Sequence, residues 1–298
     1  MKLFVRDLTV IDASYLCPQR GLVGESWLVD IELGGALNEM SMLLDFSRVK
    51  KQVKAVIDRE VDHRLLVPAT HPACQHGPSE SGRQWLDFAS ARGSLHLHCP
   101  AEAFCLLPAS QVDEASVSDY LLGLLAQVLP DNVQGLTVTL RPECHQTPYY
   151  HYSHGLKKHD GNCQRIAHGH RSMIEIWVEG ARDAALEAMW ARRWQDIYLG
   201  SQEDKVPVQS LSLSPAAGQQ IGPDHYGFAY VAPQGHFELA IPAAHCELVD
   251  TDTTVELLAD YIARKLRPQL PGRALRVVAY EGVGKGAYVD YPAQAEPV

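Results

Sequence analysis

The chain has 298 residues, 46% of them hydrophobic and 21% charged, which is the composition of a folded globular protein. Because compact domains cluster near about 100–150 residues, this length favours two domains. The net charge is −10 and the basic residues are scattered, so we expect no nucleic-acid partner. No apolar stretch reaches membrane-spanning length, and residues 1–12 alternate like a strand, not like a signal peptide. We therefore expect a cytoplasmic protein with no membrane partner.

Hydrophobic periodicity predicts an α+β protein with antiparallel strands in hairpins. The first half is predicted to contain, in the order strand, strand, helix, hairpin, helix and strand, the segments 1–12, 26–34, 46–57, 84–98, 116–129 and 135–141. In the second half, a helix is predicted over 183–194 and a last strand over 275–279. The glycine-rich run 282–286 follows that strand with no helix behind it, so it is predicted to be a turn.

The same order of elements repeats along the chain at an offset near 140 residues. Residues 93–101 and 235–243 both alternate apolar side chains before a Pro-Ala pair, and the helices containing Asp119-Tyr120 and Asp260-Tyr261 follow them. A repeat of this length indicates a tandem duplication. We expect the two halves to join between about residues 141 and 147.

A pair of histidines, His168 and His170, opens the alternating run of residues 172–178. Along a strand, side chains two residues apart share a face, so both imidazoles can point at one atom, and His154 on the preceding strand can supply a third. Three imidazoles with an open fourth position are a typical catalytic zinc site. The spacing alone is equally compatible with solvated strand histidines, since a second such pair occurs at residues 96 and 98.

The segment from Tyr152 to His170, which contains Cys163, resembles the zinc and catalytic-cysteine signature of the 6-pyruvoyltetrahydropterin synthase family, which includes bacterial 6-carboxytetrahydropterin synthase. Further along, Thr254 and Glu256 resemble the start of the family's second helix, with Thr253 in place of a proline. Glu281 falls at the position of the family's pterin-anchoring glutamate.

The first half resembles the same family at other positions. Residues 42–46 resemble a conserved strand end of the family, and Asp62-His63 resembles its catalytic Asp-His pair. Tyr15, however, stands where the first zinc histidine is expected, and residues 23–25 (Val-Gly-Glu) replace the His-x-His motif. We therefore predict no zinc in the first half.

The second half shows the reciprocal loss, because aligning its first helix puts Asp196-Ile197 at the Asp-His position. The family resemblance implies that the Asp-His pair and the zinc-cysteine cluster of one site come from different subunits. A chain with two fused modules then needs only one Asp-His pair and one zinc-cysteine cluster. The implied composite site contains catalytic Cys163, Asp62 and His63, metal ligands His154, His168 and His170, and substrate-binding Glu281, Thr254 and Glu256.

The resemblance implies two tunnelling-fold (T-fold) modules, each an antiparallel four-stranded type of sheet with an added hairpin and two helices on one face. We expect a degenerate module at residues 1–143 and the zinc-binding module at 144–298. We expect the chain to assemble as a homo-oligomer, a trimer or a dimer of trimers of fused modules.

The implied function is a Zn²⁺-dependent lyase acting on 7,8-dihydroneopterin triphosphate, in which the cysteine is the base and the histidine relays the proton. The 6-carboxytetrahydropterin product of the queuosine pathway is favoured. The pyruvoyl product and a non-catalytic protein that binds zinc and pterin remain alternatives, as do a structural thiol or a fourth zinc ligand for Cys163.

Overall fold

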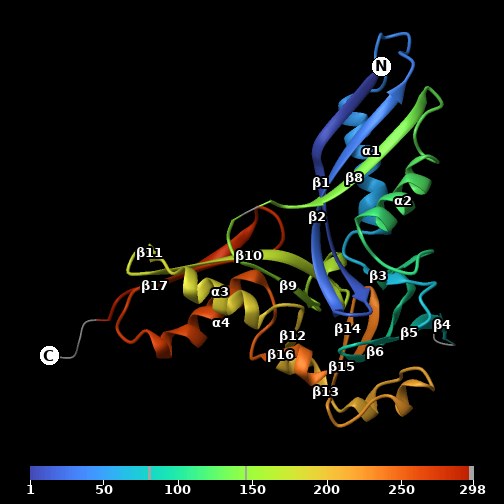
Figure 1. The fold of residues 1–298 in the computed structure, drawn as a ribbon. Helices are drawn as coiled ribbons and strands as arrows, with labels where there is room; N and C mark the ends of the chain where they lie inside the picture. Colours follow the sequence, from blue (N-terminus) through green and yellow to red (C-terminus); the bar gives the residue numbers. More distant parts are fainter. Residues whose placement is uncertain (80–81, 145, 295–298) are drawn as a thin grey trace.

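The computed structural model describes residues 1–79, 82–144 and 146–294, and it confirms an α+β fold built from two modules (Figure 1). The first module has a five-stranded sheet in the order β7-β3-β1-β2-β8. Its members are β1 (Lys2–Cys17), β2 (Gly21–Gly35), β3 (Leu65–Pro68), β7 (Phe104–Leu107) and β8 (Val133–Pro142). The predicted strands 1–12 and 26–34 are parts of one long β1–β2 hairpin.

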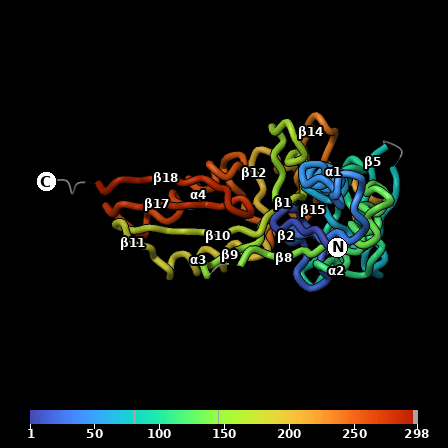
Figure 2. Tube along the Cα trace, turned by 90° about the horizontal axis from the view of Figure 1, so that it is seen from above, coloured from blue at the N-terminus to red at the C-terminus, as the bar shows by residue number. Residues whose placement is uncertain are grey.

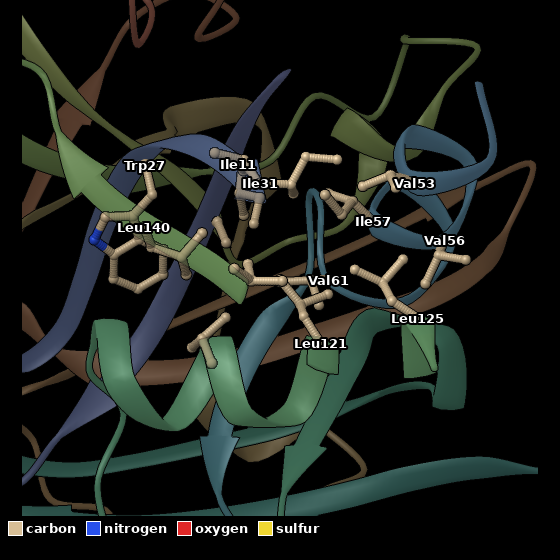
Figure 3. Close-up of a cluster of buried hydrophobic side chains, with 14 of the residues drawn as sticks. Ile11, Trp27, Ile31, Val53, Val56, Ile57, Val61, Leu121, Leu125 and Leu140 are labelled. Carbon is tan, nitrogen blue, oxygen red and sulfur yellow. The ribbon is translucent and has the colours of Figure 1, made fainter. Parts of the chain in front are cut away.

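Two helices, α1 (Phe46–Glu60) and α2 (Glu114–Leu125), cover one face of this sheet. The Asp45 side chain caps α1 by accepting from the backbone N–H groups of residues 47 and 48, and Asp113 forms a capping box with Ser116 at the start of α2. Figure 3 shows Val53, Val56 and Ile57 of α1 beside Leu121 and Leu125 of α2, packed against strand residues. This apolar cluster fixes the end of α1, from which the Asp62-His63 pair follows.

The second module repeats this plan with a seven-stranded sheet. The strand order is β16-β12-β9-β10-β17-β18, and β11 pairs with β10. These strands are β9 (Tyr149–His154), β10 (His168–Val178), β11 (Ala181–Arg182), β12 (Ile197–Ser201), β16 (Cys246–Val249), β17 (Leu275–Tyr280) and β18 (Gly286–Tyr291). The helices are α3 (Ala184–Arg193) and α4 (Val255–Leu266), which agree with the predicted helical positions.

The sheets differ in one respect from the expected four antiparallel strands. In both modules the first strand of the hairpin also pairs in parallel with a short strand that follows the first helix: β1 pairs with β3, and β9 pairs with β12. A further strand pairs in parallel with this short strand at the edge of each sheet: β7 with β3 in the first module, and β16 with β12 in the second. The parallel pairs place the residues after the first helix next to the end of the hairpin's first strand.

The inserted hairpins of the two halves join in a third sheet, in the order β13-β14-β15-β6-β5-β4. Its strands are β4 (Cys74–Pro78), β5 (Arg83–Ser90), β6 (Gly93–Pro100), β13 (Lys205–Val206), β14 (His225–Ala232) and β15 (Gly235–Pro242). The two halves meet where Leu239 of β15 pairs with Leu97 of β6. Short 3₁₀ turns occupy Ala101–Ala103, Asn162–Gln164, Gln202–Asp204, Val208–Ser210, Ala217–Gln219, Ala243–His245 and Arg267–Gln269.

The modules also dock directly, because the β1–β2 hairpin lies across β9 and β10 near the middle of the molecule (Figures 1 and 2). The hydroxyl oxygens of Ser14 and Ser153 are 2.7 Å apart at this contact. Glycine is required for such close approach, since a Cβ on Gly24 would lie 1.9 Å from the carbonyl oxygen of Tyr152. Side chains of the first module therefore reach the second module's β9–β10 hairpin. Among the described residues, no helix is long and apolar enough to cross a membrane.

Candidate metal and catalytic site

Three histidines converge at the open end of the β9–β10 hairpin. His154 ends β9, His168 begins β10, and these two residues are direct partners across the ladder. His170 lies two residues further along β10 on the same face. The ring centroid of His168 is 4.4 Å from that of His154 and 5.6 Å from that of His170. One ligand atom from each side chain lies within 4.8 Å of the others, so this triad can hold a metal ion.

The hydrogen bonding of the triad fits metal binding. His154 Nδ1 is 3.1 Å from the carbonyl oxygen of Thr253, and His168 Nδ1 is 3.0 Å from that of Arg165. Each Nδ1 therefore donates a proton to a carbonyl, which leaves Nε2 as the lone-pair nitrogen. The Nε2 atoms of all three histidines are buried and have no hydrogen-bond partner among the described residues. Burial also lowers the pKa of His154 and His168 well below the usual value, which favours neutral imidazoles.

The loop between the two strands carries Cys163 next to this triad. Cys163 lies in the turn Asn162–Gln164, and the Cys163, His63 and His168 ligand atoms all lie within 4.8 Å of one another. The hairpin of β14 and β15 supports the loop. Tyr230 donates a hydrogen bond to the Gln164 carbonyl at 2.7 Å, the Gln234 backbone N–H donates to the Gln164 side chain, and the Gln234 side-chain amide donates to Asn162. The hairpin of β14 and β15 thus holds the loop that carries the cysteine.

The Asp62-His63 pair of the first module meets this cluster from the other side. Nδ1 of His63 is 2.7 Å from Oδ2 of Asp62, and its ring centroid is 5.3 Å from that of His168. Burial disfavours the charged ring, but hydrogen bonds to Asp62 and Cys163 outweigh it and raise the pKa of His63 to about 10. The structure therefore brings the Asp-His pair of one half and the histidine-cysteine cluster of the other half together within a single chain.

The three predicted substrate-binding residues lie at different distances from the cluster. Glu281 is in the turn after β17, and its Oε1 is 3.9 Å from His170 Nε2. Thr254 precedes α4, and the preceding Thr253 is the residue that contacts His154. The Glu256 side chain is exposed on the first turn of α4, and among the described residues it makes no hydrogen bond or ion pair with the cluster. The geometry therefore supports Glu281 more strongly than Glu256 as a site residue.

Sequence patterns did not identify two residues that hold the cluster in place. Arg165 is 5% exposed, and its guanidinium lies 3.3 Å from the His63 carbonyl while its own carbonyl accepts from His168. Thr253 holds His154 through both its carbonyl and its hydroxyl oxygen. Both act partly through backbone carbonyls, which every residue type provides, so no side-chain motif marks them.

In the first module the corresponding positions hold no metal-binding set. Pairing registers place Tyr15, Val23 and Glu25 where the second module has its three histidines, as the sequence predicted. The predicted match of Asp196 with Asp62 is wrong by one residue. Asp196 matches His63, because both have a positive φ of 55°. Each lies in the turn between the first helix of its module and the short parallel strand: His63 is two residues before β3, and Asp196 is one residue before β12. The conclusion that the second half lacks the catalytic histidine is unchanged.

Comparisons with known proteins agree with the duplication. The sequence model of the family described as 6-pyruvoyl tetrahydropterin synthase matches residues 15–134 and again 143–292. A solved 6-pyruvoyl tetrahydropterin synthase from Plasmodium vivax is 15% identical, with 47% of this chain and 97% of that chain covered and a TM-score of 0.37. The Plasmodium falciparum enzyme is 14% identical, with the same coverage of 47% and 97% and a TM-score of 0.36. No curated protein sequence matches the chain significantly.

Proposed function

The chain belongs to the 6-pyruvoyl tetrahydropterin synthase family, and from this premise we propose that it is a zinc-dependent lyase acting on 7,8-dihydroneopterin triphosphate. The proposed products are 6-carboxy-5,6,7,8-tetrahydropterin, acetaldehyde and triphosphate. The supporting observation is the meeting of His63, Cys163 and His168 within 4.8 Å, although they come from different halves of the chain. A duplicated pair of modules that had lost function would have no need to keep these two complementary sets in contact.

We propose that the module at residues 1–143 supplies the Asp-His pair and that the module at 144–298 supplies the metal ligands, the cysteine and the pterin anchor. The metal ligands in this proposal are His154, His168 and His170, which each offer one ligand atom within 4.8 Å of the others and whose Nε2 atoms have no partner among the described residues. Zinc held there supplies a Lewis acid that polarises the side-chain oxygens of the substrate and acidifies the adjacent C–H bonds.

The protein's own groups carry the proton transfers in this proposal. The Cys163 thiolate takes a proton from the substrate side chain. Asp62 engages Nδ1 of His63, so Nε2 is the ring nitrogen available to exchange that proton with the thiol. The ligand atoms of His63 and Cys163 lie within 4.8 Å of each other, which gives the proton a short path.

Glu281 is proposed to anchor the pterin. A carboxylate can accept two N–H donors from the guanidine-like edge of a pterin in a bidentate pair. Its Oε1 lies 3.9 Å from His170, so a ring held by Glu281 would place its substituent next to the metal ligands. The Arg165 guanidinium, bound to the carbonyl of His63, helps to close the same site.

The test is product formation from 7,8-dihydroneopterin triphosphate by the zinc-loaded protein, with acetaldehyde and the pterin followed by chromatography. His63→Gln and Cys163→Ala are expected to reduce turnover by about 10²–10⁴-fold, the usual contribution of a positioned acid or base. The matched control is His225→Gln, because Asp224-His225 is a second Asp-His pair that lies at the start of β14, away from the cluster.

The outcomes separate the alternatives. A pyruvoyl product without acetaldehyde would indicate the alternative activity, that of a 6-pyruvoyltetrahydropterin synthase. Unchanged turnover in His63→Gln would contradict the composite site. No turnover in a wild-type chain that binds zinc and pterin would indicate the non-catalytic binding protein.

A further inference from the structure

A buried carboxylate of the first module, Asp12, touches both parts of the composite site, although no motif marks it. Asp12 lies on β1 and is 3% exposed. Its Oδ1 is 3.2 Å from Nδ1 of His170, without an aligned hydrogen bond, and it accepts a hydrogen bond from Ser26 Oγ at 2.5 Å. Its Oδ2 accepts from Lys285 Nζ at 3.1 Å.

The backbone of the same residue holds the Asp-His pair. The Asp12 N–H donates to Oδ1 of Asp62 at 2.9 Å, and the Asp12 carbonyl accepts from the His63 N–H at 2.7 Å. His63 has a φ of 55°, a conformation that non-glycine residues rarely adopt without support from their surroundings. The two hydrogen bonds to Asp12 provide that support.

The contacts of the carboxylate fit a buried anion. Ser26 Oγ donates to its Oδ1 and the Lys285 ammonium donates to its Oδ2. A buried anion needs such partners, because an unpaired buried charge is costly. The carboxylate is therefore available to orient a neighbouring imidazole.

Lys285 extends the connection to the proposed pterin anchor. The Glu281 N–H donates to the Lys285 carbonyl at 3.0 Å, so both residues belong to one turn. Gly282 in that turn has a φ of +73°, and a Cβ there would lie 2.4 Å from Asp12 Oδ1. The glycine-rich run 282–286, predicted only as a turn, thus packs directly on Asp12.

We propose that Asp12 is a positioning residue that sets His170 and the Asp62-His63 pair relative to each other across the two modules. Its carboxylate lies 3.2 Å from Nδ1 of His170, on the side away from Nε2, which stays available for the metal, and its backbone hydrogen-bonds to the pair. Carboxylates that orient metal-binding imidazoles in this way raise metal affinity. The proposal rests on the proposed function only for its catalytic part, since the effect on metal binding is independent of turnover.

The experiment compares zinc affinity in Asp12→Asn and wild type, measured by competition with a chromophoric chelator. We expect about 10–100-fold weaker zinc binding in the variant, as for other carboxylates that support a metal ligand. The matched control is Asp30→Asn, since Asp30 is also a buried aspartate of the first module, 4% exposed, but pairs with Arg6 and Arg141. Zinc affinity in Asp30→Asn should equal that of wild type.

A second readout is the ¹⁵N chemical shift of the imidazoles in the zinc-loaded protein. Asp12→Asn should move the Nδ1 signal of His170 and leave that of His154, which is held by Thr253. Equal zinc affinity in Asp12→Asn and wild type, or an equal loss in Asp30→Asn, would overturn the proposal. Because the readouts are affinity and chemical shift, a wild-type protein that binds zinc without turnover would reject the proposed function and still test Asp12.

Discussion

The two modules have the same backbone arrangement at the end of the first hairpin but carry different side chains there. In the second module, a strand pair carries His154, His168 and His170, and four of their ring nitrogens have no hydrogen-bond partner in the described part of the chain. In the first module, the same positions carry Tyr15, Val23 and Glu25. The thirteen-residue connection that bears Cys163, residues 155–167, corresponds to a tight turn at residues 18–20. The second module therefore has a side-chain set that could hold a metal, and the first module has neither that set nor the longer loop with a cysteine.

At the place in the first module that corresponds to the histidine-cysteine cluster, the structure has an ion pair. Arg20, in that tight turn, donates to both carboxylate oxygens of Asp196, at 2.5 and 3.1 Å, and to the Tyr15 hydroxyl at 3.0 Å. Asp196 occupies the position that His63 has in the other half. The charged partners thus form a bidentate contact at the position where the other half has the Asp-His pair beside the histidine triad.

The contacts across the module interface are reciprocal as well. Asp12 of the first module approaches His170 of the second at 3.2 Å, and His151, the counterpart of Asp12, approaches Glu25, the counterpart of His170, at 3.6 Å. At one contact the carboxylate is on β1 and the imidazole on β10; at the other the imidazole is on β9 and the carboxylate on β2. The comparison teaches that the docking geometry of the duplicated modules is kept at both positions, while only one position keeps the side chains for metal chemistry.

Loss of the metal ligands is expected to have the largest effect. His168→Ala removes one ligand of the triad and leaves too few protein donors for tight zinc binding, so the zinc content should fall from about one per chain to nearly zero and turnover by about 10³-fold or more. The counterpart variant Val23→Ala should retain the full zinc content. The measurement is metal analysis after dialysis, and zinc lost equally from both variants would contradict the difference between the modules.

The ion pair of the first module should contribute to stability without contributing to turnover. Asp196→Asn leaves Arg20 without its bidentate partner next to buried groups, and we expect a loss of about 2–4 kcal/mol in the free energy of unfolding. Urea unfolding of the metal-free protein measures the effect. A large drop in turnover per folded molecule, with stability unchanged, would mean that this region is a second functional site.

Glu25 should produce a smaller, pH-dependent effect. Burial, partly offset by the Ser26 N–H, raises the pKa of Glu25 to about 7. Because the folded-state pKa lies above the unfolded value, ionisation of Glu25 costs stability progressively from about pH 4.5 to pH 7. Glu25→Gln should therefore be about 1–2 kcal/mol more stable than wild type at pH 8 and nearly equal to it at pH 5. A gain of the same size at both pH values would assign the effect to packing.

Much of this arrangement could be predicted from the sequence, because aligning the two repeats shows which half lacks each functional side chain. The duplication, the α+β class and the absence of the histidine set at Tyr15, Val23 and Glu25 all follow from comparing the halves. The one-residue error at Asp196 arose because the turn after a helix has no fixed length in sequence. Its register became clear only from the shared positive φ of residues 63 and 196.

The supporting contacts could not be predicted from sequence. Thr253 and Arg165 hold histidines through carbonyl groups, and Asp12 acts on a residue 158 positions further along the chain, at His170. Contacts of this kind depend on how the modules dock. The merging of the two inserted hairpins through β6 and β15 is equally non-local, since neither hairpin alone indicates its partner.

The central claim is that each chain assembles its own site from both modules, and complementation tests it most directly. His63→Gln and Cys163→Ala chains are produced together so that mixed oligomers form, and turnover is compared with that of wild type. Sites within single chains predict no recovery, because every chain lacks one of the two groups. Recovery to roughly a quarter of wild-type turnover, the statistical share of intact sites formed between chains, would contradict the claim.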